Sequence, residues 1–95
     1  MDGNINFYAS LRDWSPWDEA EVLKMEFVNR AQLAKSITCV GLLVDLSLDQ
    51  HSEVRRAVAE NPITPLSTLK RLAEQDLCTG VQETAKNTLT TLVKA

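Results

Sequence analysis

The side chains that most often perform chemistry in proteins are scarce in this sequence and poorly placed for it. Cys39 and Cys78 lie far apart, and His51 is the only histidine. A lone histidine forms neither a catalytic triad with a nearby cysteine nor a metal site without further ligands. Asp45 and Asp49, four residues apart, are interpreted as solvated surface carboxylates. We therefore expect no catalytic residue, no metal site and no cofactor, and we predict that the chain is not an enzyme.

Glycine spacing, cysteine spacing and the start of the chain exclude further classes of protein. Gly3, Gly41 and Gly80 are too scattered to form a loop that holds a phosphate or a dinucleotide. Two cysteines without a paired spacing are typical of reduced thiols in a cytoplasmic protein. Residues 1–4 are too polar to begin a secretion signal, and the apolar stretch 40–48 is too short to span a bilayer. We expect a soluble protein in the cytoplasm.

The composition indicates one small helical domain with a chemically distinct beginning. The 95 residues carry a net charge of −3, and alanine, leucine, valine, glutamate and lysine dominate, which favours helices over strands. Residues 1–26 hold six acidic and two basic side chains, whereas the remainder holds seven acidic and eight basic ones. All five aromatic residues lie within the first 27 positions. The overall charge provides no general attraction to nucleic acid.

An internal repeat is the strongest structural signal. Residues 28–50 align without a gap on residues 54–76, at an offset of 26. The identical pairs are Val28/Val54, Arg30/Arg56, Ala31/Ala57, Ile37/Ile63, Thr38/Thr64, Leu43/Leu69 and Leu46/Leu72. A degraded third copy begins at Val81, one residue late, and it places Asn87 in the register of Asn61. Apolar residues that recur in this way at helical spacings predict stacked helices.

Local signals divide each repeat into two short helices. Ser52 is expected to cap a helix that has Glu53 in its first turn and that stops at Asn61, because a proline follows. Thr64 is expected to cap the second helix, with Pro65 at its first position. Neither helix is long enough to be stable alone, so stacking must bury their apolar faces.

Both ends of the chain are expected to close the stack. The capping motif SPWD at residues 15–18 starts a helix that we expect to continue into the first repeat. At the other end, Thr79 is expected to cap a helix with an apolar face of Val81, Ala85, Leu89, Leu92 and Val93. The predicted organisation of one domain, residues 1–95, is an aromatic and acidic N-terminal cap at 1–27, repeat 1 at 28–50, repeat 2 at 54–76 and a degenerate terminal repeat or capping helix at 79–95.

Repeat 2, with the sequence VRRAVAENPITPLSTLKRLAEQD, resembles the leucine-rich repeat variant family. The residues that match the family pattern are Val54, Arg55, Val58, Ala59, Asn61, Pro62, Thr64, Pro65, Leu69, Leu72 and Ala73. Repeat 1 matches less well, since Lys35, Ser36 and Cys39 replace the asparagine and both prolines. The resemblance implies an all-α, short right-handed α-solenoid of helix pairs, akin to HEAT and armadillo arrays. Some family members hold an iron–sulfur cluster on N-terminal cysteines, which this chain lacks before Cys39.

Five basic residues form the first candidate binding surface: Arg30, Arg55, Arg56, Lys70 and Arg71. Stacking is expected to align Arg30 with Arg56, and such a row would suit an acidic protein or nucleic acid. The interpretation that we favour is that each arginine pairs with nearby acids such as Glu26, Glu53 or Glu60 and packs its aliphatic stem on neighbours.

The aromatic residues near the beginning of the chain form the second candidate surface: Trp14 and Trp17, with Phe7 and Tyr8. If they are exposed, they form an anchor for a protein partner. If they are buried, they plug the open end of the first repeat, and we favour this because the end of a stack must be covered.

The absence of reactive groups and the extended surface of stacked repeats predict a non-catalytic protein–protein interaction module. The sequence does not identify its protein partner, and self-association as a homo-oligomer is kept open because few repeats leave apolar faces uncovered. The alternative is a nucleic-acid-binding helical array that uses the Arg30, Arg55, Arg56, Lys70 and Arg71 face. No contact with membranes is expected.

Overall fold

The computed structural model describes residues 4–94, and this part of the chain is entirely helical. Its helices are α1 (Asn4–Ala9), α2 (Pro16–Leu23), α3 (Phe27–Ala34), α4 (Val40–Leu46), α5 (Ser52–Glu60), α6 (Leu66–Gln75) and α7 (Thr79–Lys94). The prediction of an all-α protein is confirmed for these residues. None of the described helices combines the length and the apolar character needed to cross a membrane.

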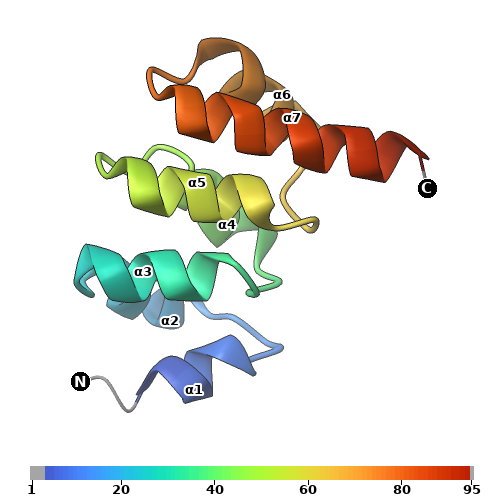
Figure 1. The fold of residues 1–95 in the computed structure, drawn as a ribbon. Helices are drawn as coiled ribbons and strands as arrows, with labels where there is room; N and C mark the ends of the chain where they lie inside the picture. The colour runs from blue at the N-terminus through green and yellow to red at the C-terminus, as the bar shows by residue number, and fades with distance from the viewer. Residues whose placement is uncertain (1–3, 95) are drawn as a thin grey trace.

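The helices lie in two layers (Figure 1). The helices α1, α3, α5 and α7 lie one above another in the near layer, and α2, α4 and α6 lie behind them in the far layer. The most extensive packing joins α3 to α5, α5 to α7 and α6 to α7. The molecule measures 34 × 27 × 19 Å, and the two ends of the chain lie at opposite ends of the stack.

An apolar core fills the space between the layers. The largest fully buried apolar side chains are Val22, Leu33, Ile37, Leu42, Leu43, Leu46, Val54, Val58, Leu69, Leu72 and Val81. Burial of one such side chain contributes about 1.5–3 kcal/mol. Most of these helices are ten residues or shorter, and helices of that length are marginal in water. Packing between helices therefore holds the fold together.

The far layer keeps the 26-residue register that the sequence predicts. Leu43 and Leu69 are both fully buried at equivalent positions of α4 and α6, and so are Leu46 and Leu72. The two helices therefore present the same face to the core.

The near layer does not keep this register, and the gapless alignment is wrong there. Val54 is fully buried in α5, whereas Val28 in α3 is 56% exposed. Likewise Ile37 is buried and Ile63 is exposed. The reason is the unequal spacing of the near-layer helices, since α5 begins 25 residues after α3 and α7 begins 27 residues after α5, and neither spacing equals the offset of 26.

The helix α2 begins as predicted and ends earlier than expected. Its first turn is closed by a capping box, in which the Ser15 hydroxyl accepts from the Asp18 N–H at 3.2 Å and the Asp18 carboxylate accepts from the Ser15 N–H at 3.1 Å. The chain does not continue as one helix into repeat 1. The N–H groups of Lys24 and Met25 instead bond to carbonyls three residues back, and this tight turn separates α2 from α3.

The predicted caps of α5, α6 and α7 are wrong. The residue before α5 is His51, and Ser52 is the first residue of that helix. The residue before α6 is Pro65, and the hydroxyl of Thr64 donates at 2.8 Å to the carbonyl of Val58, near the end of α5. Thr79 is the first residue of α7, so Cys78 takes the position before the helix. Of the apolar face expected for α7, Val93 is exposed, because only the first half of this helix packs deeply against its neighbours.

A buried asparagine joins the C-terminal ends of two neighbouring helices in the near layer. Asn61 is 1% exposed, and its amide nitrogen donates to the carbonyls of Ala34 and Ile37, each at 2.9 Å. Its amide oxygen accepts from the Ile63 N–H at 2.8 Å. Carbonyls at the end of a helix have no partner within the helix, so the side chain of Asn61 satisfies α3 from the end of α5.

Thr88 makes the corresponding contact one level further along the stack. Its hydroxyl donates at 2.6 Å to the carbonyl of Ala59, at the end of α5. The sequence predicts that Asn87 takes the place of Asn61, but Asn87 is exposed. The extra residue before α7 shifts the register, so the threonine and not the asparagine meets the preceding helix.

Replacing Asn61 therefore tests how strongly this joint contributes to stability. We expect Asn61→Ala to lower the free energy of unfolding by about 2–3 kcal/mol, because it leaves buried carbonyls and an N–H without partners. Asn87→Ala, the matched control, changes it by less than about 0.5 kcal/mol. Urea unfolding followed by circular dichroism measures both, and equal effects of the two substitutions would contradict the role of Asn61.

Candidate functional site

Two buried ion pairs of the same design link successive levels of the stack. Arg30 in α3 donates from Nε to Oδ2 of Asp49 at 2.8 Å and from Nη2 to Oδ1 at 3.2 Å. Arg55 in α5 donates to Asp76 in the same bidentate way, at 2.8 and 3.3 Å. Each carboxylate lies in the turn before the next helix of the near layer. Each arginine therefore reaches from one level to the next.

The same arginines also bind the turn behind them. Arg30 Nη1 donates to the carbonyl of Met25, and Arg55 Nη1 donates to the carbonyl of Asp49 at 2.8 Å. In α7 the same position is held by Gln82, whose amide donates to the carbonyl of Asp76 at 2.6 Å. The structural counterpart of Arg30 is thus Arg55, and the predicted alignment of Arg30 with Arg56 is wrong.

The carboxylates are held in their ionised form by these contacts. Burial raises the pKa of Asp49, but hydrogen bonds from Arg30 and His51 and the charge of Arg30 outweigh it and lower this pKa below its ordinary value. The hydrogen bonds and charge of Asp76 raise the pKa of Arg55. The expectation that Asp49 is a solvated surface carboxylate is wrong, since its side chain is 9% exposed. Both arginine charges are neutralised within the fold.

Arg71 in α6 differs from Arg30 and Arg55. Its guanidinium donates to the hydroxyl of Ser47 at the end of α4. No carboxylate within the described part of the chain forms an ion pair with it. The charge of this arginine is therefore balanced by no acid of its own chain in residues 4–94.

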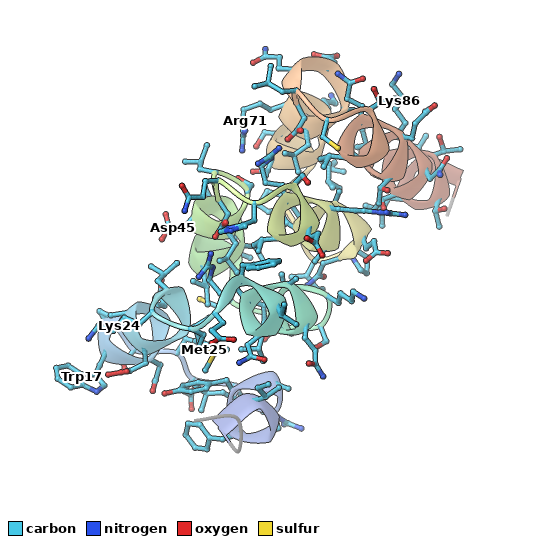
Figure 2. All side chains as sticks on the ribbon, turned by 60° about the vertical axis from the view of Figure 1, so that its left-hand side comes forward. Trp17, Lys24, Met25, Asp45, Arg71 and Lys86 are labelled. Carbon is cyan, nitrogen blue, oxygen red and sulfur yellow. The ribbon has the colours of Figure 1, made fainter. Side chains whose placement is uncertain are left out.

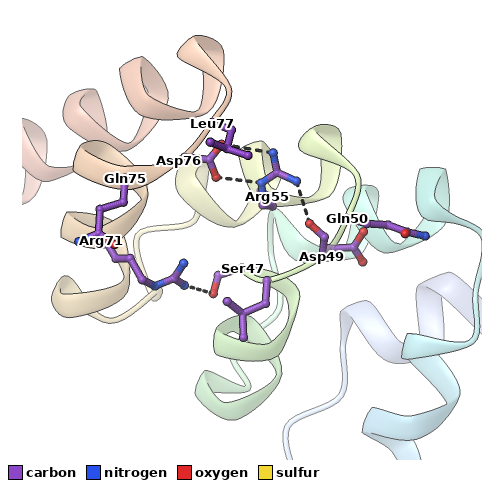
Figure 3. A pocket seen from close by; sticks show the side chains of 9 residues that line it. Ser47, Asp49, Gln50, Arg55, Arg71, Gln75, Asp76 and Leu77 are labelled. Carbon is purple, nitrogen blue, oxygen red and sulfur yellow. Dashed lines mark hydrogen bonds and ion pairs between the residues drawn. The ribbon is translucent and has the colours of Figure 1, made fainter.

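Arg71 and Arg55 lie in one groove between the turn after α4 and the turn after α6 (Figure 3). Its volume is about 410 Å³, and it is lined by Ser47, Leu48, Asp49, Gln50, Arg55, Arg71, Gln75, Asp76 and Leu77. The two leucines frame it from the two turns. Leu48 is 68% exposed and Leu77 is 99% exposed. The groove thus combines one uncompensated positive charge with two apolar side chains in contact with solvent.

The structure does not bring the five predicted basic residues onto one face. Arg55 and Arg71 share the groove, and Arg30 lies next to it in its own ion pair with Asp49. Arg56 lines a separate hollow between α3 and α5 together with Lys35, Glu53 and Glu60. Lys70 is exposed on α6 outside the groove. The partners of Arg30 and Arg55 are Asp49 and Asp76, not the glutamates expected from the sequence.

The four aromatic residues of the second candidate surface divide into a pair that packs against the core and an exposed pair. Tyr8 is buried and stacks on Trp14 at 5.9 Å between ring centroids, and the Trp14 indole donates to the Leu11 carbonyl at 3.1 Å. Both pack against the core as the plug interpretation expects. Phe7 and Trp17 are exposed, and Trp17 projects away from the body of the molecule (Figure 2).

His51 and Cys78, which were considered as reactive residues, both make contacts within the fold. The His51 ring stacks on Phe27 at 4.2 Å and lies 3.3 Å from the Asp49 carboxylate. Cys78 is half-buried before α7. Backbone N–H groups of Val81 and Gly80 and the Ser52 hydroxyl lower the pKa of its thiol, against the opposing effects of burial and Asp76. In residues 4–94 there is no cluster of three histidine, cysteine or acidic side chains that could hold a metal ion.

Comparisons with protein families, with curated proteins and with solved structures find no match for this chain. The fold and the groove therefore have to be interpreted from the chain's own geometry.

The ion pair of Asp49 predicts an acid-dependent loss of stability. Folding lowers the pKa of Asp49, so the ion pair stabilises the folded chain above the pKa of an unfolded aspartate, about 3.9. This stabilisation is lost as the pH falls through the lowered pKa of the folded state. We expect Asp49→Asn to be less stable than the wild type at pH 7 but to lose less stability between pH 5 and pH 2. Asp45→Asn, at an exposed position of α4, should keep the wild-type dependence in urea titrations at each pH.

The position of Cys78 predicts a thiol that ionises more readily in the folded chain. In a Cys39→Ser variant, the rate of alkylation by iodoacetamide should rise with pH around a lower midpoint when the chain is folded than when it is unfolded in urea. Folding then gains stability as the pH rises through the folded pKa. Identical midpoints in the two states would show that the N–H groups in the first turn of α7 do not stabilise the thiolate.

Proposed function

We propose that this chain is a non-catalytic protein-binding module of the helical-repeat type. In this proposal it is a short right-handed solenoid of helix pairs of the leucine-rich repeat variant kind, closed by an aromatic N-terminal cap and a C-terminal capping helix. The two layers of helices support it, as do the two equivalent Arg–Asp pairs between levels. The free thiols of Cys39 and Cys78 support a cytoplasmic location.

The observation that carries the proposal is the difference between Arg71 and the two arginines that pair with aspartates between levels. Arg30 and Arg55 are neutralised by bidentate aspartates, whereas Arg71 has the Ser47 hydroxyl alone among its hydrogen-bond partners in residues 4–94. A guanidinium has five N–H donors in a planar fork that matches a carboxylate. Most of the donors of Arg71 therefore remain for a carboxylate from another molecule.

The leucines beside Arg71 specify the rest of the partner. Leu48 and Leu77 project from the two turns and together expose a large apolar area at the groove. Apolar side chains that frame a polar contact exclude water from it and strengthen it. The groove therefore suits a protein segment that carries a carboxylate next to a large apolar or aromatic side chain.

The alternative of a nucleic-acid-binding array has less support. Phosphate-backbone binding requires several lysine or arginine side chains free to contact successive phosphates. Arg30 and Arg55 are mostly buried and already paired, and Arg56 lies in a different hollow among glutamates. The proposed function is therefore protein binding.

Selection from a library of displayed random peptides tests this proposal directly. We expect the wild-type chain to enrich peptides with aspartate or glutamate next to leucine, phenylalanine or tryptophan. Binding of these peptides should fall at least tenfold in Arg71→Glu, because the variant places a negative charge in the groove. Arg56→Glu, which makes the same charge change elsewhere, should bind as the wild type does. Enrichment of no peptide, or peptides that bind Arg71→Glu equally well, would overturn the proposal.

A further inference from the structure

We infer that the groove takes a second copy of this chain, through the exposed face of its helix α2. The inference rests on the proposed function, because it names an occupant for the same groove. It places Trp17 of one copy between Leu48 and Leu77 of another, with acidic residues near Trp17 facing Arg71.

Trp17 is the most suitable exposed aromatic side chain for such a contact. It lies in the first turn of α2 and is 75% exposed. The capping box of Ser15 and Asp18, with Pro16 between them, fixes the backbone of this turn. The side chain is therefore presented from a rigid helix start and points away from its own chain (Figure 2). Ordering it at an interface costs little entropy, since tryptophan has few rotatable bonds.

The charges near Trp17 are complementary to the groove. Residues 1–26 carry an excess of four negative charges, and the rest of the chain has an excess of one positive charge. Asp13 is exposed just before α2. Glu21 lies one turn after Trp17 on the same side of the helix, where it is half-buried and lies 4.0 Å from the exposed Lys24 in an ion pair. The beginning of the chain thus presents an exposed aromatic ring within an acidic segment. This is the combination that Arg71, Leu48 and Leu77 suit.

The dimensions of the groove agree with this occupant. A hollow of about 410 Å³ falls within the range of about 300–1,000 Å³ that is usual for sites that hold a small organic group. The leucines contact the two sides of an inserted indole, and a guanidinium beside its face adds a cation–π attraction. Burial of one tryptophan and its surroundings covers less area than a stable dimer needs, so the association is weak.

The two surfaces in contact are different, so the association is head to tail. Trp17 lies at the start of α2, whereas the groove lies between the turns that follow α4 and α6. A copy that donates Trp17 still has a vacant groove, and a copy whose groove is filled still has a free Trp17. The contact therefore joins copies into chains that lengthen with concentration.

Sedimentation of the full chain and of two complementary variants tests the inference. The mean mass of the wild type should rise above 10.6 kDa between about 10 µM and 1 mM, the range expected for a weak interface. Trp17→Ala and Arg71→Glu should each remain monomeric when alone. Mixed in equal amounts, they should form a pair of twice the monomer mass and nothing larger, because one retains the groove and the other retains Trp17.

Matched variants control for changes in charge and in apolar surface. Arg56→Glu reverses an exposed charge outside the groove, and Val93→Ala removes an exposed apolar side chain on α7. Both should associate as the wild type does. Arg71→Gln, which keeps a donor for Ser47, should weaken association about tenfold and covers the case in which Arg71→Glu does not fold.

A wild type that stays monomeric to 1 mM would overturn the second-copy inference, and so would association that survives Trp17→Ala or a mixture that forms no pair. None of these results alters the peptide selection. A monomeric protein that still selects acidic, apolar peptides through Arg71 would show that the groove serves a different protein. Failure of the selection would instead remove the proposed function itself.

Discussion

The stack depends on the burial of a carboxylate in the turns that lead into α5 and α7. Asp49 and Asp76 each accept an N–H two residues further on, from His51 and from Cys78, and this contact shapes the turn. A buried carboxylate is unfavourable unless it is paired and fully hydrogen-bonded. The previous helix of the layer must therefore supply an arginine at a position from which its guanidinium reaches the carboxylate. The spacing of successive levels follows from the reach of that arginine.

A second row of contacts lies at the opposite edge of the near layer. It allows successive near-layer helices to be separated by different numbers of residues. Asn61 and Thr88 both bind the last carbonyls of the helix below, although one is an amide and the other a hydroxyl. With one row at each end of the helices, the number of residues per level can change without loss of contact. This explains how levels that are 25 and 27 residues apart stack in the same way.

The sequence predicts those features that depend on neighbours in the chain, such as the capping box at Ser15 and the end of α5 before Pro62. It also predicts the buried leucines of the far layer, because α4 and α6 keep one spacing. It does not predict the pairs Arg30–Asp49 and Arg55–Asp76, whose members are about twenty residues apart. These pairs follow from the spacing of the near-layer helices, and a gapless alignment hides them by matching Arg30 to Arg56. The sequence does not predict the groove either, since Leu48 and Leu77 belong to no repeated pattern.

The far-layer register explains why Arg71 has no counterpart at the level of α4. At an offset of 26, the position that Arg71 holds in α6 is held in α4 by Asp45, which is exposed. The helices α4 and α6 thus carry opposite charges at equivalent positions on the same face. The level next to α2 in its own chain carries the aspartate, so it repels the carboxylates around Trp17. The positive level lies further along the stack, and in the described structure Trp17 points into solvent. In the proposed association, the opposite charges of α4 and α6 therefore favour contact between chains over contact within one.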